Sequence, residues 1–197
     1  TDKGKAFKIK VHELPEGKRA TKGKPIINFI SLSPEEKVTS LLVLPKKLKK
    51  EDASLILITK NGAIKKVSAS YFEDVRRSGI LAIRLAKGDE LKWSHLAFKG
   101  DHIILATALG QAIRFNEKDL REMGRQAAGI RGIRLKKGDE VVGMGVIEPS
   151  AKTASKNVSK PDKKYLLVLT ENGYGKRTEI EDYRLQKRGG SGIKTGK

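Results

Sequence analysis

Paired cationic side chains stand beside glycines at four places in the 197-residue chain. Lysine and arginine attract anionic oxygen atoms. A neighbouring glycine, which has no Cβ, lets backbone N–H groups come close to an anion. The fullest example is residues 186–192, with the sequence QKRGGSG. These residue types in this order predict contacts with phosphate groups, although such glycines could also serve only the positive φ of tight turns.

The clusters recur because the sequence contains an internal repeat. Turns that begin with Thr and end with Gly occur at residues 1–4, 59–62, 107–110 and 170–173, and a second glycine follows each one after 17 or 19 residues. The tripeptide Gly-Asp-Glu also recurs after 50 residues, at 88–90 and 138–140. With the insertions at 46–52 and 150–163 set aside, the period is about fifty residues, the length of a four-stranded propeller blade.

Short strands are expected to carry these turns. Asn61-Gly62 between two apolar runs is a strong hairpin signal. Only residues 117–123 are expected to form a helical turn. The predicted strands are residues 7–11, 26–32, 38–44, 55–58, 80–85, 103–106 and 165–169.

The fold class that follows is all-β, a propeller-like array of four-stranded blades in one domain. We expect repeats at about 1–50, 51–99, 100–149 and 164–197, with a flexible insertion at 150–163. Because the first and last repeats lack strands that the others have, we expect a fragment of a longer protein.

The charge balance predicts a polyanionic partner. Lysine and arginine number 42 against 23 acidic residues, a formal net charge of +19. A merely solubilising lysine surface is the alternative, but the cations recur in register. The absence of cysteine excludes disulfides and fits the cytoplasm, and no apolar run is long enough to span a membrane.

Aromatic content favours a duplex over a single-stranded partner. Single-strand binders stack bases on aromatic side chains, but only 5% of the residues here are aromatic. Burial in strands is the expected role of Phe72, Phe115 and Tyr165. Contacts with duplex phosphates would read little sequence and could hold the duplex bent.

Catalytic motifs are not found in the sequence. The three histidines, His12, His95 and His102, have no metal-ligand spacing. No phosphate-binding P-loop or nucleophile elbow occurs, so the sequence does not predict ATP hydrolysis by this chain. The carboxylates of the two Gly-Asp-Glu segments are expected to serve turn geometry.

Residues 186–192 resemble the QRRGGKG box of the C-terminal domain of the DNA gyrase A subunit. Residues 20–30, 121–135 and 170–184 are also similar to that domain, so the resemblance covers most of the chain. It implies a six-bladed β-pinwheel, in which neighbouring blades exchange a strand and duplex DNA wraps around a basic rim. In the family the box lies in the first blade, whereas here it closes the last repeat, with Lys187 and Ser191 in place of Arg and Lys.

The resemblance also implies a larger enzyme. In the gyrase family two A and two B subunits form an ATP-dependent type IIA topoisomerase that introduces negative supercoils. ATP and Mg²⁺ bind to other parts of that holoenzyme, so no cofactor is expected in this chain. The C subunit of topoisomerase IV has the same domain type and is the alternative, as is a basic propeller that binds acidic proteins.

The candidate phosphate contacts are the cations near the repeated turns and the box itself. The cations are Lys8, Lys10, Arg19, Lys22, Lys24, Lys65, Lys66, Arg76, Arg77, Arg114, Arg125, Arg131, Arg134, Lys176, Arg177, Lys187 and Arg188. The other box residues are Gln186, Gly189, Gly190, Ser191 and Gly192, and the glycines are expected to permit close approach to the duplex.

Overall fold

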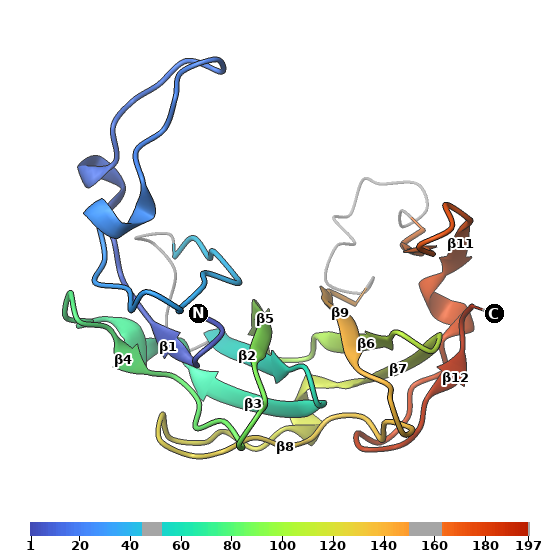
Figure 1. Ribbon diagram of the computed structural model, residues 1–197. Helices are drawn as coiled ribbons and strands as arrows, with labels where there is room; N and C mark the ends of the chain where they lie inside the picture. Colours follow the sequence, from blue (N-terminus) through green and yellow to red (C-terminus); the bar gives the residue numbers. More distant parts are fainter. Residues whose placement is uncertain (45–52, 150–162, 197) are drawn as a thin grey trace, which may run out of the picture.

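Short antiparallel strands follow one another along a curved row (Figure 1). The computed structural model describes residues 1–44, 53–149 and 163–196, and these ranges contain no α-helix. The strands are β1 (Lys5–Ala6), β2 (Ala53–Thr59), β3 (Ala63–Ser68), β4 (Ile80–Leu81), β5 (Leu91–Phe98), β6 (His102–Thr107), β7 (Gln111–Asn116), β8 (Ile130–Arg131), β9 (Val141–Ile147), β10 (Tyr165–Leu169), β11 (Gly175–Glu179) and β12 (Ile193–Lys194). The 3₁₀ turns are η1 (Val11–Glu13), η2 (Ile26–Asn28), η4 (Ala69–Phe72), η5 (Glu117–Asp119) and η6 (Ile180–Asp182).

Two four-stranded antiparallel sheets form the centre of the row. Their strand orders are β5-β2-β3-β8 and β12-β7-β6-β9. The hairpin between β2 and β3 turns at Gly62, which has a φ of 81°. In this left-handed region glycine avoids the Cβ clash of other residues. The predicted hairpin is therefore confirmed, and so are the predicted four-stranded blades for the two central sheets, whereas β1-β4 and β10-β11 are two-stranded.

The fourth strand of each sheet comes from the next repeat. β8 belongs to the third repeat but pairs with β3 of the second, and β12 of the fourth repeat pairs with β7 of the third. In the same way β4 of the second repeat pairs with β1 of the first. The second, third and fourth repeats thus each place one short strand, here called the lent strand, beside a strand of the preceding repeat. This pairing confirms the strand exchange that the resemblance implied.

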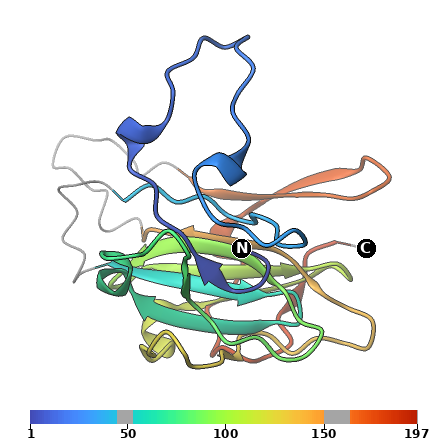
Figure 2. The ribbon, with the colours of Figure 1, turned by 60° about the vertical axis from the view of Figure 1, so that its left-hand side comes forward.

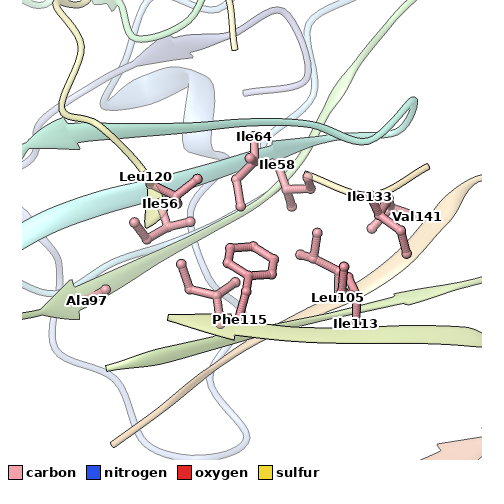
Figure 3. Close-up of a cluster of buried hydrophobic side chains, with 11 residues drawn as sticks. Ile56, Ile58, Ile64, Ala97, Leu105, Ile113, Phe115, Leu120, Ile133 and Val141 are labelled. Atoms are coloured by element: carbon pink, nitrogen blue, oxygen red, sulfur yellow. The ribbon is translucent and has the colours of Figure 1, made fainter. Parts of the chain in front are cut away.

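A hydrophobic core fills the space between the two central sheets (Figure 3). Ile56 and Ile58 of one sheet face Leu105, Ile113 and Phe115 of the other, and all five are fully buried. Each such side chain stabilises the fold by about 1.5–3 kcal/mol relative to exposure. Because a hairpin alone is marginal in water, this shared core is what makes neighbouring repeats stabilise one another.

The first repeat differs from the sequence prediction. Residues 7–11 and 38–44 form no strand, and residues 26–32, predicted as a buried strand, contain the exposed turn η2. A strand needs a backbone hydrogen-bonding partner, and no described strand pairs with these segments. Ser40 approaches β5, but there the backbone N–H of Ser94 donates to the Ser40 hydroxyl at 3.0 Å. The segment from η1 to η2 instead rises away from the sheets in both views (Figures 1 and 2).

Four smaller predictions also need correction. The predicted strand 80–85 is limited to β4, and the helical turn at 117–123 is the three-residue η5. Phe115 is buried in β7 as expected, but Phe72 is buried in η4 instead of a strand. Tyr165 is 39% exposed, because the β10–β11 hairpin pairs with no further described strand. The insertions at 46–52 and 150–162 lie outside the described residues.

Candidate nucleic-acid interface

The loops that follow the lent strands β4 and β8 carry exposed cations at equivalent positions. Both loops have the sequence Ile-Arg-Leu-X-Lys-Gly-Asp-Glu, at residues 83–90 and 133–140. The buried residues Ile83 and Ile133 anchor their starts. The cations that remain exposed on the two loops are Arg84, Lys87, Arg134, Lys136 and Lys137.

The acidic residues of these loops are used to fix the turns. Asp89 Oδ1 accepts hydrogen bonds from the backbone N–H groups of Asn61 at 3.0 Å and Glu90 at 2.9 Å. Asp139 Oδ1 does the same for Leu109 at 2.9 Å and Glu140 at 3.0 Å. The expected turn role is confirmed for the two aspartates, whereas Glu90 pairs with Lys92 at 2.7 Å and Glu140 pairs with Lys60 at 2.9 Å. Since backbone donors hold the aspartates, these two carboxylates leave the cations of the loops available to solvent.

Most of the predicted cations lie on the surface. Lys8 donates to the carbonyl of Glu73, and the Arg177 guanidinium lies over the Tyr165 ring, 4.4 Å from its centre. Arg125 and Arg188 are half-buried. The exposed members of the predicted set are Lys8, Lys10, Arg19, Lys22, Lys24, Arg76, Arg77, Arg131, Arg134, Lys176, Arg177 and Lys187.

Lys65 lies in the interior and does not reach solvent. It is fully buried in β3, and its Nζ donates to the carbonyls of Ala82 at 2.7 Å, Arg125 at 2.6 Å and Ala127 at 3.0 Å. Burial lowers the pKa of its ammonium to about 8. A phosphate cannot reach this group in the folded chain, so the prediction of a phosphate contact at Lys65 is corrected to a structural role.

Arg114 is a second interior cation. Its Nη1 donates to the carbonyls of Ile180 at 2.8 Å and Tyr183 at 3.3 Å, and it pairs with Glu181 at 3.2 Å. Its Nη2 lies 3.0 Å from His102 Nδ1. Burial and then the nearby guanidinium lower the pKa of the His102 imidazole. Arg114 therefore ties η6 of the fourth repeat to β7 of the third, and it too leaves the set of phosphate contacts.

Lys66 is mostly withdrawn from the surface. Its ammonium pairs with the buried Glu117, and its side chain is 15% exposed. A second oxygen of Glu117 accepts from the backbone N–H of Gly100 at 3.2 Å. This ion pair joins the second repeat to the third, so Lys66 also has a structural role.

The box residues pack against the preceding repeat. The N–H of Gly189 donates to the Gly132 carbonyl at 2.7 Å, and the N–H of Arg134 donates to the Gly190 carbonyl at 2.8 Å. Arg188 donates through Nε to the carbonyl of Asp119 at 3.0 Å and through Nη1 to that of Arg131 at 3.1 Å. Within the box, Lys187 and Ser191 are exposed, whereas Gln186 is half-buried.

The repeated second glycine serves this packing. A Cβ at Gly192 would lie 2.3 Å from the carbonyl oxygen of Ala112, and one at Gly129 would lie 2.9 Å from that of Ile64. Both contacts are shorter than real Cβ contacts. The glycine lets the lent strand approach the sheet of the preceding repeat. The close approach that was expected between glycine and duplex is thus one between two repeats of the protein.

An open groove of about 540 Å³ lies where the β2–β3 turn meets the third repeat. Asn61 and Gly62 of the second repeat and Arg131 and Arg134 of the third are among its lining residues. No group of three His, Asp or Glu side chains that could hold a metal ion occurs in the described ranges. Within them, no helix is long and apolar enough to cross a membrane.

On the loops after β4 and β8, four exposed cations were not among the predicted contacts: Arg84, Lys87, Lys136 and Lys137. The signal was present, because the Gly-Asp-Glu repeat aligns Arg84 with Arg134 and Lys87 with Lys137. They were missed because the prediction considered only the cations around the turn glycine and the second glycine of each repeat.

Comparison with known proteins assigns the family. Residues 1–45, 53–93, 101–148 and 164–197 match the family described as the DNA gyrase C-terminal domain, beta-propeller. The chain belongs to this family. The resemblance noted from the box is thereby confirmed, together with the propeller-like fold.

Sequence relatives in this gyrase family are bacterial. The chain is 41% identical over 195 residues to the A subunit of DNA gyrase from Staphylococcus epidermidis, and 42% identical over 195 residues to that from Staphylococcus aureus. The alignments cover 99% of the chain and 20% and 21% of the two relatives. The chain thus spans about one fifth of the length of these curated relatives.

Solved structures of two topoisomerase domains share the fold. A structure of the DNA gyrase A C-terminal domain has a TM-score of 0.75 at 28% identity, covering 98% of this chain and 57% of that one. A C-terminal domain of DNA topoisomerase IV has a TM-score of 0.81 at 24% identity, covering 98% and 56%. At that identity the second likeness shows the fold alone.

Proposed function

We propose that this gyrase-family chain binds duplex DNA through its phosphates, without sequence preference, and bends it. The observation that carries the proposal is the pair of equivalent loops after β4 and β8. Each presents an exposed arginine and lysine while its own aspartate is held by backbone N–H groups. The same cations thus recur from blade to blade, as a backbone-following contact requires.

The proposed contact set consists of exposed and half-exposed cations. Arg84, Lys87, Lys136 and Lys137 join the predicted ones that the fold leaves accessible. The set is Lys8, Lys10, Arg19, Lys22, Lys24, Arg76, Arg77, Arg84, Lys87, Arg125, Arg131, Arg134, Lys136, Lys137, Lys176, Arg177, Lys187 and Arg188.

Family membership supports a role in a larger enzyme. In this proposal the chain is part of a β-pinwheel domain that wraps DNA for ATP-dependent negative supercoiling by a cytoplasmic type IIA topoisomerase. Its partners would be the gyrase B subunit together with the N-terminal part of the gyrase A protein. Smoothly bending a site of 20–30 bp costs about 1–6 kcal/mol, and counterion release at several phosphates can offset this.

Salt dependence tests the binding mode. The dissociation constants of the chain for two duplexes of unrelated sequence are measured over a range of salt concentrations. We expect equal affinities at each salt concentration, and a log–log slope near −9 if about ten phosphates are neutralised. A strong preference for one duplex would contradict the proposal. So would a clear preference for an acidic polypeptide over DNA at equal charge, which would favour the protein-binding alternative.

A topological assay tests whether the chain wraps the duplex. The chain is incubated with relaxed circular plasmid, a nicking-closing enzyme is added, and the linking-number shift is read on a gel. A positive shift that grows with protein concentration is the expected result. Tight, salt-sensitive binding with no shift would show that the chain binds DNA without wrapping it.

A further inference from the structure

We propose that Lys65 is a positioning residue, whose ammonium holds the loop before β8 on the preceding repeat and so places the cations that contact DNA, without touching DNA itself. The part concerning DNA rests on the proposed function. The loop comprises residues 124–129 and is called the joint loop of the third repeat. The corresponding joint loop of the fourth repeat comprises residues 187–192.

Lys65 connects three repeats through backbone carbonyls. Ala82, which accepts from Lys65 Nζ at 2.7 Å, itself donates its N–H to Gly4 of the first repeat at 2.8 Å. The other two acceptors, Arg125 and Ala127, lie in the joint loop of the third repeat. One buried ammonium therefore fastens the strand exchange on one side of the second repeat to the joint loop on its other side.

The hydrogen bonds of Lys65 help to position two candidate phosphate contacts, Arg125 and Arg84. Arg125 contributes its own carbonyl to Lys65, which fixes the backbone from which its half-exposed side chain leaves. The Ala127 carbonyl also accepts from the N–H of Arg84 at 3.3 Å. Exposed Arg84 and half-exposed Arg125 belong to different repeats. Their relative placement therefore depends on the contact that Lys65 makes.

The contact between the third and fourth repeats is made without a lysine side chain. Strand register makes Ile113 of β7 equivalent to Lys65 of β3, and Gly132 equivalent to Ala82. Ile113 is fully buried and apolar. The Gly132 carbonyl instead accepts from the N–H of Gly189 at 2.7 Å. A backbone N–H of the box makes the bond that the Lys65 side chain makes one repeat earlier.

The use of a backbone donor at one contact and of the Lys65 side chain at the other explains why the two joint loops differ in sequence. The two central positions of the joint loop are Gly189 and Gly190 in the fourth repeat, but Gln126 and Ala127 in the third. Gly189 has a φ of 80°, a left-handed conformation that other residues rarely adopt. The double glycine lets the backbone N–H of Gly189 turn toward the Gly132 carbonyl. In the third repeat, where the double glycine is absent, the Lys65 ammonium donates to the equivalent carbonyl of Ala82.

The experiment replaces the lysine contact of the third repeat by the double-glycine contact of the fourth, in the full 197-residue chain. Lys65→Ile removes the ammonium and installs the residue of the next repeat, and the triple variant Lys65→Ile, Gln126→Gly, Ala127→Gly adds the double glycine. Hydrogen exchange of residues 124–129 reports the loop, and duplex affinity and the linking-number shift are measured in parallel. Lys87→Met, an exposed lysine with the same loss of charge, is the matched control.

We expect Lys65→Ile to raise loop exchange by about tenfold, since three carbonyls lose the Lys65 ammonium as a donor, and to reduce the linking-number shift at equal bound protein. Its salt slope should equal that of the wild type, because Lys65 touches no phosphate. The triple variant should recover both loop protection and linking-number shift. Lys87→Met should lower the salt slope by about 0.9 and leave loop exchange unchanged.

Three outcomes would overturn the proposal. They are unchanged loop exchange in Lys65→Ile, a lower salt slope in that variant, or a triple variant that recovers nothing. If Lys65→Ile does not fold, the triple variant decides, because the proposal requires it to fold with a protected loop. If the wild type binds no DNA, the proposed function fails, while loop exchange still tests the role of Lys65 at the joint.

Discussion

The carbonyl of Gly62 accepts a hydrogen bond of 2.9 Å from the N–H of Gly132 in the next repeat. The same bond joins Gly4 to Ala82 and Gly110 to Thr195, each at 2.8 Å. Turn glycines and lent strands therefore meet at every joint between repeats. The regular spacing of glycines in the sequence reflects this contact. The cations beside these glycines therefore occupy equivalent positions in successive repeats.

Gly192→Ala should destabilise the chain by about 3 kcal/mol. Its φ is 72°, and the new Cβ would lie 2.3 Å from the Ala112 carbonyl oxygen. Gly138→Ala is the control, because Gly138 has a φ of 77° but no atom within 4 Å of the added Cβ. The control should lose only the conformational term, about 1–2 kcal/mol. Urea unfolding measures both, and equal losses would show that the collision is relieved.

Arg84→Ala and Arg134→Ala should each weaken binding to any duplex equally. Both side chains are exposed at equivalent positions after lent strands. Each substitution is expected to lower the log–log salt slope by about 0.9, with the stability of the fold changed by less than about 0.5 kcal/mol. Fluorescence anisotropy with two unrelated duplexes checks this, and a loss confined to one sequence would argue for base readout.

Arg114→Met should unfold more easily without a direct effect on DNA contacts. The substitution leaves the buried carbonyls of Ile180 and Tyr183 without their donor, at a cost of about 3 kcal/mol. Arg184→Met, at an exposed arginine that follows Tyr183 in the sequence, should change stability by less than about 0.5 kcal/mol. Thermal and urea unfolding measure the effect. A fully stable Arg114→Met with weak DNA affinity would instead place Arg114 at the interface.

Lys65 should make stability depend on pH in an alkaline window. Burial lowers its pKa from 10.5 to about 8 in the folded chain. Between these values the unfolded chain binds a proton that the folded chain does not, so the free energy of unfolding contributed by Lys65 rises with pH. The charged residues on the segments that contact it, Lys66, Arg84 and Arg125, are all cations.

Two measurements check this pH dependence. Nitrogen-15 NMR of labelled lysine should show one amino group titrating near pH 8, and the Lys65→Ile, Gln126→Gly, Ala127→Gly variant should lack it. Urea unfolding of the two proteins should show a stability difference that changes between pH 8 and pH 10.5, with the wild type gaining as pH rises. A pH-independent difference would contradict the assignment of this titration to Lys65.

Local sequence was enough to predict the repeat and its turns. Asn61-Gly62 between apolar runs predicted the hairpin, and the spacing of Gly-Asp-Glu predicted loops that the structure places in equivalent positions. These features depend on φ preferences and on hydrogen bonds between neighbouring residues, which a short segment contains within itself. The box resemblance then predicted strand exchange and the family, both of which are confirmed.

Whether a given lysine faces solvent or the interior depended on the tertiary structure. Lys65 and Lys87 both lie near repeat turns, but Lys65 points into a joint where carbonyls from two repeats converge. Likewise the apolar residues 38–44 resemble a strand, yet form none because a strand needs a partner. Pattern and turn chemistry are properties of the sequence alone, whereas burial and pairing depend on which distant segment lies alongside, and this is decided only when the repeats pack.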